Sequence, residues 1–258
     1  MSAPVVLLHA LATSSAMWSA QRRAFVGAGH QVLTPDQRGY GTTPLGPAGP
    51  SLDVAADDLA ALLDRQEIGS VALAGASMGG YVAMAFLRRH PGRVRALMLV
   101  STKASADTPA EAAQRRAFAS LILDPASRAR VVAAAIPTLL GATTRGGRPE
   151  VVAAVRGLVE NTSPEAIAWS QRAIADRREA FGVLRATNVP SVVVAGEEDE
   201  LVSLTEAREV ADCLPGAELV TVPKAGHLAP METPGAVTAA LAEVLSRAAL
   251  SPGVRRKA

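Results

Sequence analysis

Ser77 lies in a short segment whose residue types favour nucleophilic chemistry. Gly75-Ala-Ser77-Met-Gly79 reads G-x-S-x-G, between the apolar run 71–74 and the amphipathic run 80–87. This pattern is typical of a strand, a sharp turn and a helix, a turn that presents the serine above the carboxyl edge of a parallel sheet. We predict that both flanking glycines are required, because the turn leaves no room for a Cβ.

A serine hydroxyl is a weak nucleophile unless a neighbouring base activates it. The four histidines are His9, His30, His90 and His227. In hydrolases with this strand-turn-helix motif the chain order is serine, acid, histidine, and only His227 lies well beyond Ser77. It follows the strand-like run 218–222 on a loop, so we predict that His227 is the base.

The acid of such a site orients the imidazole and stabilises its charged form. The apolar run 192–195 is followed at once by Gly196-Glu-Glu198-Asp199-Glu200. Asp199, at the fourth position after the strand, is the predicted acid, and Glu198 is the alternative. A plain acidic turn is the remaining interpretation of this run.

Four segments in this order resemble the α/β-hydrolase superfamily, and the resemblance covers nearly all of the chain. They are the strand and histidine at 4–9, the D-x-R-G-x-G loop at 36–41, Gly196–Asp199, and Gly226-His227. The segment from His9 to Trp18 is similar to the branch that contains carboxylesterases and 3-oxoadipate enol-lactonases, although those enzymes differ at the position of His9. The resemblance implies a hydrolase with this fold.

The resemblance also implies an oxyanion hole made of the backbone N–H groups of Leu11 and Met78. Ala10 stands where many relatives have glycine, which adds a methyl group but leaves the N–H in place. His9 is expected to brace this loop by hydrogen bonding. Trp18 is expected to pack around the first helix, with substrate binding as the alternative.

Two further residues are expected to have structural roles. Arg38 should brace the 36–41 loop, with substrate contact as the alternative, and Tyr81 should belong to the core behind the serine.

The remaining pattern alternates short apolar runs with amphipathic ones. We predict strands near 5–9, 31–35, 71–75, 94–101, 191–196 and 218–222. We predict helices near 18–28, 52–66, 77–90, 204–213 and 234–249. Such alternation indicates an α/β fold with a mostly parallel sheet of about six strands and helices on both faces. By resemblance, the hairpin that usually leads this fold is expected to be absent.

Residues 104–187 interrupt the alternation, since no strand pattern occurs there. Four helix starts are marked by prolines at 109, 125, 149 and 164. We therefore predict a core of residues 1–103 and 188–258 with an inserted helical lid at 104–187. The lid holds 11 arginines and 8 acidic residues. This excess could favour an acidic substrate, or the arginines could form a solvated face.

Composition excludes several classes of function. The net charge of +2 is too small to indicate nucleic-acid binding, and Cys213 is the single cysteine. No Cys/His cluster, phosphate loop or dinucleotide fingerprint occurs, so we expect neither metal nor cofactor. No apolar run approaches the roughly 20 residues that span a bilayer, and no signal peptide is evident. We expect a cytoplasmic monomer or homodimer with no membrane partner.

These observations favour one reaction. We expect a serine hydrolase that cleaves a small carboxylic ester or lactone through an acyl-enzyme. The same residues would also serve C–C bond hydrolysis, perhydrolysis, cyanohydrin cleavage or biosynthetic lactonisation. A non-catalytic ligand-binding module is the further alternative.

Overall fold

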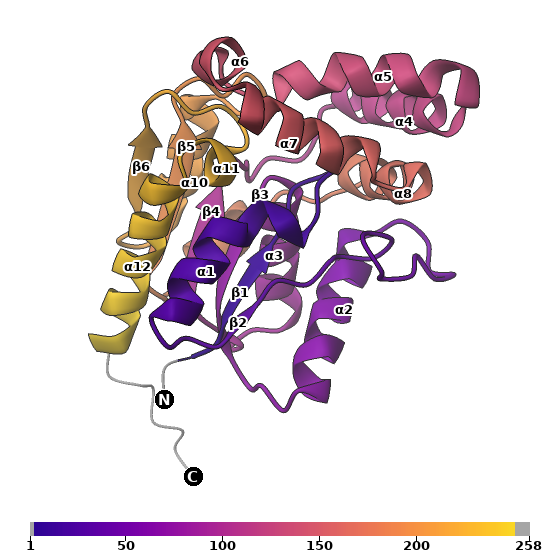
Figure 1. Cartoon of the computed structure of the whole chain (residues 1–258). Helices are drawn as coiled ribbons and strands as arrows, with labels where there is room; N and C mark the ends of the chain where they lie inside the picture. Colours follow the sequence, from indigo (N-terminus) through magenta and orange to yellow (C-terminus); the bar gives the residue numbers. More distant parts are fainter. Residues whose placement is uncertain (1–2, 251–258) are drawn as a thin grey trace.

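The computed structural model describes residues 3–250, which build a six-stranded sheet between two layers of helices (Figure 1). The strands are β1 (Val5–Leu8), β2 (Val32–Leu33), β3 (Val71–Ala76), β4 (Val94–Val100), β5 (Ser191–Gly196) and β6 (Glu218–Val222). Their order is β2-β1-β3-β4-β5-β6, and every neighbouring pair is parallel. The predicted α/β fold with about six strands is confirmed.

The sheet is buried on both faces because its strands carry apolar side chains at successive positions. Along β1, Val6 and Leu8 join one core cluster, whereas Val5 and Leu7 join the other. This alternation follows from the two-residue period of a strand. The runs therefore look continuously apolar in the sequence, as parallel strands covered on both faces do.

Helices from distant parts of the chain cover the two faces. The first core cluster takes its helical residues from α2 (Leu52–Arg65), α3 (Met78–Arg89) and α10 (Leu204–Cys213), and from the inserted helices α8 (Pro164–Ala175) and α9 (Phe181–Arg185). The second takes them chiefly from α12 (Pro234–Leu250) and the inserted helix α7 (Pro149–Glu160), with Phe25 from α1 (Ser19–Gly27). A short helix, α11 (Ala229–Glu232), precedes α12.

Two of the predicted elements differ in extent from the sequence prediction. The strand expected at 31–35 is only Val32–Leu33, since Pro35 has no N–H to donate to a sheet. The helix expected from residue 18 begins at Ser19, after the 3₁₀ turn η1 (Ser15–Trp18) that Ser14 caps.

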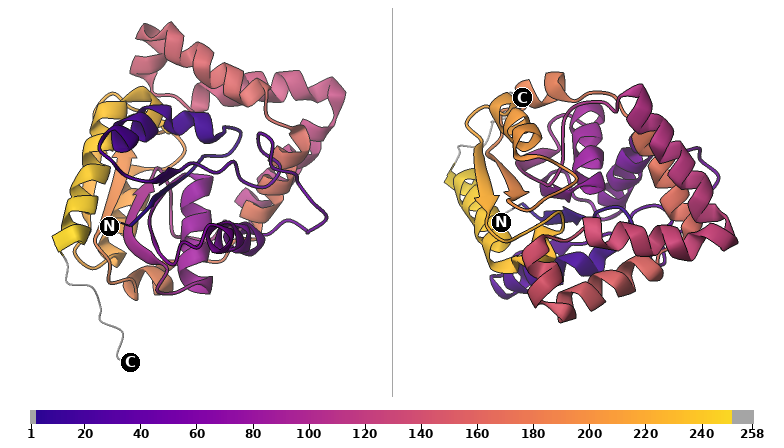
Figure 2. Two further views of the ribbon diagram at one scale, coloured as in Figure 1. Left: turned by 60° about the horizontal axis from the view of Figure 1, so that its bottom comes forward. Right: turned by 90° about the horizontal axis from the view of Figure 1, so that it is seen from above.

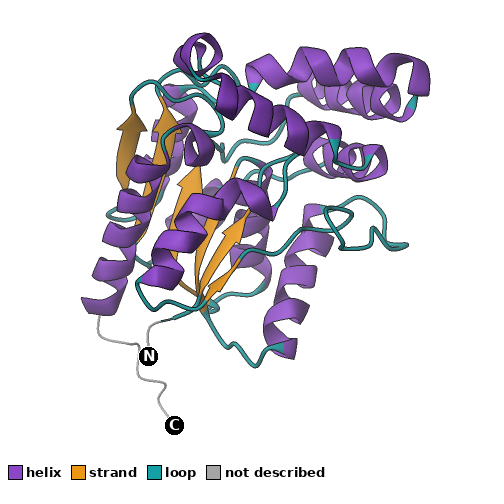
Figure 3. Cartoon of the chain, viewed as in Figure 1, coloured by secondary structure: helices purple, strands orange, loops and turns teal. Residues whose placement is uncertain are grey.

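A helical segment is inserted between β4 and β5, across the carboxyl ends of the strands (Figures 1 and 3). The four predicted helices are α4 (Pro109–Leu123), α5 (Pro125–Thr138), α7 (Pro149–Glu160) and α8 (Pro164–Ala175), each with proline in its first turn. The two further views in Figure 2 also place this segment beyond the strand ends.

The expectation of four helices in this segment is corrected to six. The additional helices are α6 (Ala142–Gly147) and α9 (Phe181–Arg185). They have six and five residues, too few for a 3.6-residue period to emerge. α9 contacts α3 and α10, so it packs against the core helices.

The two ends of the insertion are joined at its base. The N–H of Ala180 donates to the carbonyl of Ala104 at 2.8 Å. Arg177 Nη1 lies 2.6 Å from Asp107 Oδ1, and Arg177 Nε donates to the carbonyl of Ser105. The segment between these contacts therefore enters and leaves the core at one place.

Candidate active site

Ser77 occupies the sharp turn between β3 and α3. Its backbone has φ +51° and ψ −113°, a conformation that is strained for a residue with a Cβ. The turn is held from β4, since the N–H of Ser77 donates to the carbonyl of Val100 at 2.8 Å. The hydroxyl of Thr102 donates to the carbonyl of Ser77 at 3.1 Å. Such strain held in place by its surroundings is typical of functional turns.

The glycines on either side of Ser77 are needed for close backbone approach, as predicted. A Cβ on Gly75 would lie 2.2 Å from the carbonyl oxygen of Gly79. A Cβ on Gly79 would lie 2.3 Å from the carbonyl oxygen of Leu8 in β1. The turn thus closes on itself and on the neighbouring strand.

Ser77, His227 and Asp199 form a continuous hydrogen-bonded chain. Ser77 Oγ lies 2.7 Å from His227 Nε2. His227 Nδ1 lies 2.9 and 3.0 Å from the two carboxylate oxygens of Asp199. With the proton on Nδ1, the imidazole donates to Asp199 and accepts from the Ser77 hydroxyl. This is the arrangement in which a histidine can remove the serine proton.

The loop after β5 keeps Asp199 ionised beside the histidine. Burial alone would raise the pKa of Asp199, but the charge and hydrogen bonds of His227 and the N–H groups of Leu201 and Val202 lower it overall. Glu198 points elsewhere, because its carboxylate accepts from the N–H and hydroxyl of Thr143. The geometry therefore puts Asp199, and not Glu198, next to the imidazole.

The loop after β1 is braced by His9, as predicted. His9 is fully buried, and its Nδ1 donates to the carbonyl of Ala10 at 2.8 Å. Its Nε2 accepts from the N–H of Gln37 at 3.0 Å. Desolvation lowers the pKa of His9 to about 4, so the ring is neutral near pH 7. The unusual backbone of this loop is at Ala12, with φ +58°, and not at Ala10.

Of the two candidate oxyanion donors, Leu11 lines the cavity at Ser77, and Met78 directly follows Ser77 in the chain. Leu11 lines this cavity together with Ser77 and His227. Met78 is the first residue of α3, a position whose N–H has no partner within the helix. The catalytic role of the two N–H groups stays a prediction.

The cavity at Ser77 has a volume of about 420 Å³, within the range of small-molecule sites. One part of its wall is apolar and comes mainly from the insertion, with Phe118, Ile122, Val132, Leu139 and Ile167. Another part is polar, with Tyr81, Lys103, Glu111, Arg115 and Gln171. The sequence did not identify this polar set, because most of its members lie on helices that meet only in the folded chain.

Most arginines of the insertion lie away from the cavity. Several form ion pairs at the surface with nearby acids, among them Arg116 with Asp176 and Arg156 with Glu160. Of these arginines only Arg115 lines the cavity. The solvated-face interpretation therefore describes most of the set.

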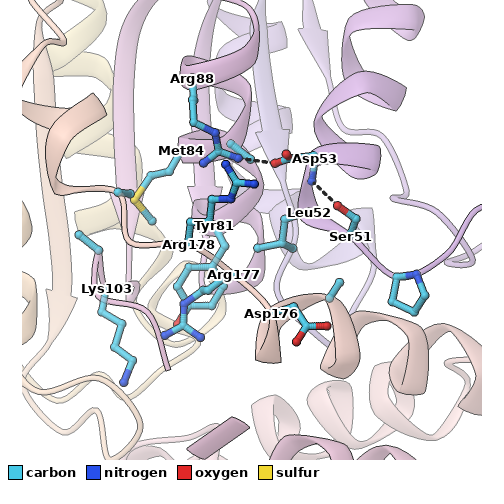
Figure 4. Close-up of a pocket in the computed structure, with 15 residues that line it drawn as sticks. Ser51, Leu52, Asp53, Tyr81, Met84, Arg88, Lys103, Asp176, Arg177 and Arg178 are labelled. Atoms are coloured by element: carbon cyan, nitrogen blue, oxygen red, sulfur yellow. Dashed lines mark hydrogen bonds and ion pairs between the residues drawn. The ribbon is translucent and has the colours of Figure 1, made fainter. Parts of the chain in front are cut away.

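A second, smaller cavity of about 170 Å³ shares part of its lining with the first, and its lining residues are shown in Figure 4. Tyr81 and Lys103 line both cavities, whereas Ser77 lines only the larger one. The guanidinium carbon of Arg177 lies 4.5 Å from the centre of the Tyr81 ring. Tyr81 is buried as predicted, but it is also a wall of the candidate active site.

The substrate-binding alternative for Trp18 is not supported. Its side chain is fully buried in the second core cluster and does not line the cavity at Ser77. Arg38 braces its loop as expected, through a bidentate ion pair with Asp58 and a hydrogen bond that it donates to the carbonyl of Leu45.

The loop that carries His227 is tied to the insertion by a buried glutamate that the sequence did not reveal. Glu232 accepts from the N–H of Gly226 at 3.0 Å and from the N–H of Gly141 at 2.8 Å. The N–H of Leu228 donates to the carbonyl of Leu139. A Cβ on Gly226 would lie 2.1 Å from the backbone nitrogen of Gly141. The insertion therefore touches the backbone on both sides of the histidine.

Two kinds of feature are absent from residues 3–250. No group of three or more histidine, cysteine or acidic side chains is placed to hold a metal ion. No helix in that range is long and apolar enough to cross a bilayer.

Comparison with known proteins gives one consistent result. A family model described as the alpha/beta hydrolase fold matches residues 3–234. A Variovorax paradoxus protein with the provisional name carbamate hydrolase RutD is 30% identical over 257 residues, which are 97% of this chain and 94% of the relative.

Two solved structures share the fold over nearly the whole chain. A thermophilic esterase from Thermogutta terrifontis, solved with malate bound, has a TM-score of 0.91 and 33% identity, covering 96% of this chain and 91% of its own. The enol-lactonase from Burkholderia xenovorans has a TM-score of 0.84 and 27% identity, covering 95% of this chain and 92% of its own. The names of the three relatives describe a carbamate hydrolase, an esterase and an enol-lactonase. Each of these is a kind of hydrolase, which supports hydrolase chemistry.

Proposed function

Because the chain belongs to the α/β-hydrolase fold family, we propose that it is a serine hydrolase that cleaves a small carboxylic ester or lactone through an acyl-enzyme. The observation that carries this proposal is the chain of contacts from Ser77 through His227 to Asp199 at the wall of a cavity. An ester or lactone is favoured by the names of the esterase and enol-lactonase neighbours.

In the first step Ser77 attacks the carbonyl carbon while His227 Nε2 takes the hydroxyl proton. Asp199 stabilises the imidazolium that forms and keeps the ring in its productive orientation. The oxyanion is held by the N–H groups of Leu11 and Met78, and the amino end of α3 adds a favourable dipole. The imidazolium then passes its proton to the leaving alkoxide, which leaves the acyl group on Ser77.

In the second step water replaces the alcohol. His227 removes a proton from water, the hydroxide attacks the acyl carbon, and Ser77 leaves with the proton returned by the imidazolium. The apolar wall from α4 and α5 suits the carbon chain of the substrate.

The test is covalent labelling combined with turnover. A serine-directed phosphonate should add one group to the protein at Ser77, and Ser77→Ala should abolish both labelling and hydrolysis of short esters and lactones. Labelling at another residue, or full turnover by Ser77→Ala, would refute the nucleophile.

A substrate panel tests the bond that is cleaved. Hydrolysis of carbamates, suggested by the name of one relative, would proceed through the same groups and belongs in this panel beside esters, lactones and C–C substrates. Cleavage of only a non-ester substrate by the pure protein would overturn the ester proposal and keep the triad. Binding without turnover of any substrate would instead favour a non-catalytic ligand-binding module.

A further inference from the structure

The polar end of the cavity at Ser77 has hydrogen-bond donors without protein partners. Arg115 uses Nε on Asp107 and Nη1 on the side-chain oxygen of Gln171, which leaves Nη2 unpartnered among residues 3–250. Gln171 is only 7% exposed, and its side-chain NH₂ group likewise has no acceptor in that range. Both residues line the cavity, so these donors are available to a ligand there.

The charges behind Arg115 leave one positive charge unbalanced. Asp107 has no exposed side-chain surface, and it is shared by two cations: Arg115 Nε and Arg177 Nη1 each lie 2.6 Å from it. Arg177 is also buried, and its Nη2 has no hydrogen-bond partner (Figure 4 shows its stacking on Tyr81). A buried cation is stable only when it is paired and hydrogen-bonded. This cluster of two cations and one carboxylate would therefore be stabilised by a second anion.

Around the neighbouring lysine, Lys103, negative charges outnumber positive ones. Lys103 lies 2.9 Å from Glu111 and 3.2 Å from Glu206, so one cation serves two carboxylates. Hydrogen bonds from Thr108 and Lys103 lower the pKa of Glu111 to about 2, which keeps it ionised. An incoming anion would be repelled here and attracted at Arg115.

We propose that the substrate carries a carboxylate group in addition to its scissile bond, and that Arg115 and Gln171 bind this carboxylate in the cavity. The inference rests on the proposed hydrolysis at Ser77, because both sites lie in one cavity. Arg115 Nη2 and the Gln171 amide together offer the two donors that a carboxylate accepts. The substrate is then a half-ester or a lactone acid.

The kinetic test uses ester pairs that differ only in the carboxylate. Monomethyl glutarate is compared with methyl pentanoate, and the acetate ester of 3-hydroxypropanoate with propyl acetate. Wild-type protein should prefer the charged member of at least one pair. Arg115→Gln should lower that preference in kcat/KM by about 10–100-fold, the loss expected for a charged hydrogen bond. Arg115→Lys should restore part of it.

Arg116→Gln is the matched control. Arg116 is the next residue of α4, but its side chain is 53% exposed and pairs with Asp176 outside the cavity. This variant should keep the wild-type preference. The Arg115→Gln protein should fold, since Asp107 keeps Arg177 as its partner. An equal loss on charged and neutral esters, or no loss on either, would overturn the carboxylate site.

A binding measurement separates this inference from the hydrolysis itself. Monomethyl glutarate should raise the Tm of Ser77→Ala protein by binding the folded state, and the neutral ester methyl pentanoate should not. The double variant with Arg115→Gln should lose the shift. Stabilisation by monomethyl glutarate without turnover of any ester by wild-type protein would refute the hydrolase and keep the carboxylate site. Ester turnover with neither stabilisation nor preference would refute the carboxylate site alone.

Discussion

The sequence pattern left two neighbouring residues, Asp199 and Glu198, as candidates for the acid beside His227. Asp199 and Glu198 are adjacent, but in the turn after β5 their carboxylates have different partners. Asp199 accepts from His227, whereas Glu198 accepts from Thr143 of the insertion. Side-chain direction in such a turn depends on the backbone N–H groups that hold each carboxylate, which are contacts the sequence pattern does not encode.

Exchange of each carboxylate for its amide tests this assignment. Asp199→Asn should keep the fold and reduce kcat by about 1,000–10,000-fold, since an amide favours the wrong imidazole tautomer. Glu198→Gln should stay within a few-fold of wild type, because that carboxylate touches no member of the triad. Steady-state turnover of one ester by the three proteins measures both effects. The reverse pattern would move the acid to Glu198.

His9 gives the protein a specific response to acid. Its folded pKa of about 4 lies below its ordinary value of 6.5, so the unfolded chain binds a proton more readily than the folded one. The native state therefore keeps its full stability above pH 6.5 and loses up to about 3 kcal/mol as the pH falls to 4.

His9→Gln should remove this part of the pH dependence. Glutamine retains a donor and an acceptor for Ala10 and Gln37 but does not titrate. The free energy of unfolding, from urea titrations at pH 7, 5.5 and 4.5, should fall less steeply in the variant than in wild type. Asp199, whose pKa is lowered, weakens both proteins alike at the acid end. Parallel curves for the two proteins would contradict a neutral, buried His9.

At the scale of elements, the sequence predicted helices and strands correctly where a segment was long enough to show a hydrophobic period or where a proline marked its start. The strands β5 and β6 and the helix α10 have the predicted bounds. The prolines at the start of α4, α5, α7 and α8 marked those helices correctly. The short elements α6, α9 and α11 were missed because they are fixed by tertiary contacts and not by their own pattern.

One of those contacts connects the insertion with the loop that carries His227. Glu232, at the end of α11, is 1% exposed and accepts from backbone N–H groups at Gly141 and Gly226. Gly226 directly precedes His227. The same carboxylate thus holds the turn before α6 and the loop that positions His227.

Glu232→Gln should weaken both loops together. The amide has one acceptor oxygen where two N–H groups require one each, so a buried donor loses its partner. We expect a loss of about 1–3 kcal/mol in the free energy of unfolding and a several-fold lower kcat. Urea unfolding and ester turnover measure the two effects.

Glu160→Gln provides the control for this change. Glu160 is a half-exposed partner of Arg156 on α7, and its substitution should change stability by no more than about 0.5 kcal/mol. If Glu232→Gln were as mild as this control, the joint anchoring of the two loops would be wrong.

At the scale of the whole molecule, the sheet supplies the triad and the insertion supplies most of the cavity. More than half of the residues that line the cavity at Ser77 come from α4, α5, α7, α8 and the turn after α5. The order of motifs predicted the first part from the sequence. The cavity could not be predicted in this way, since Arg115 and Gln171 lie 56 positions apart and meet only when α4 packs on α8.

Because the triad and most of the cavity wall come from different parts of the chain, exchanging the insertion should change substrate preference and leave the triad in place. Residues 108–176 lie between the contacts that close its base, Ala104 with Ala180 and Asp107 with Arg177. Replacing 108–176 by the equivalent segment of the Thermogutta terrifontis esterase should keep phosphonate labelling at Ser77 and change the preference among esters. An unchanged preference would mean that core loops alone shape the pocket.

The choice of boundaries for the exchanged segment should affect the stability of the chimaera. A wider exchange of 104–187 also replaces Arg177, which stacks on Tyr81 of α3, and α9, which packs on α3 and α10. At 33% identity the incoming residues are shaped to a different core. The wider chimaera should therefore have the lower Tm, because it breaks an interface that the narrower one leaves whole. Equal Tm values would place the boundary of the insertion at 104 and 187 and would show that α9 moves with the helices above the sheet and not with the core below them.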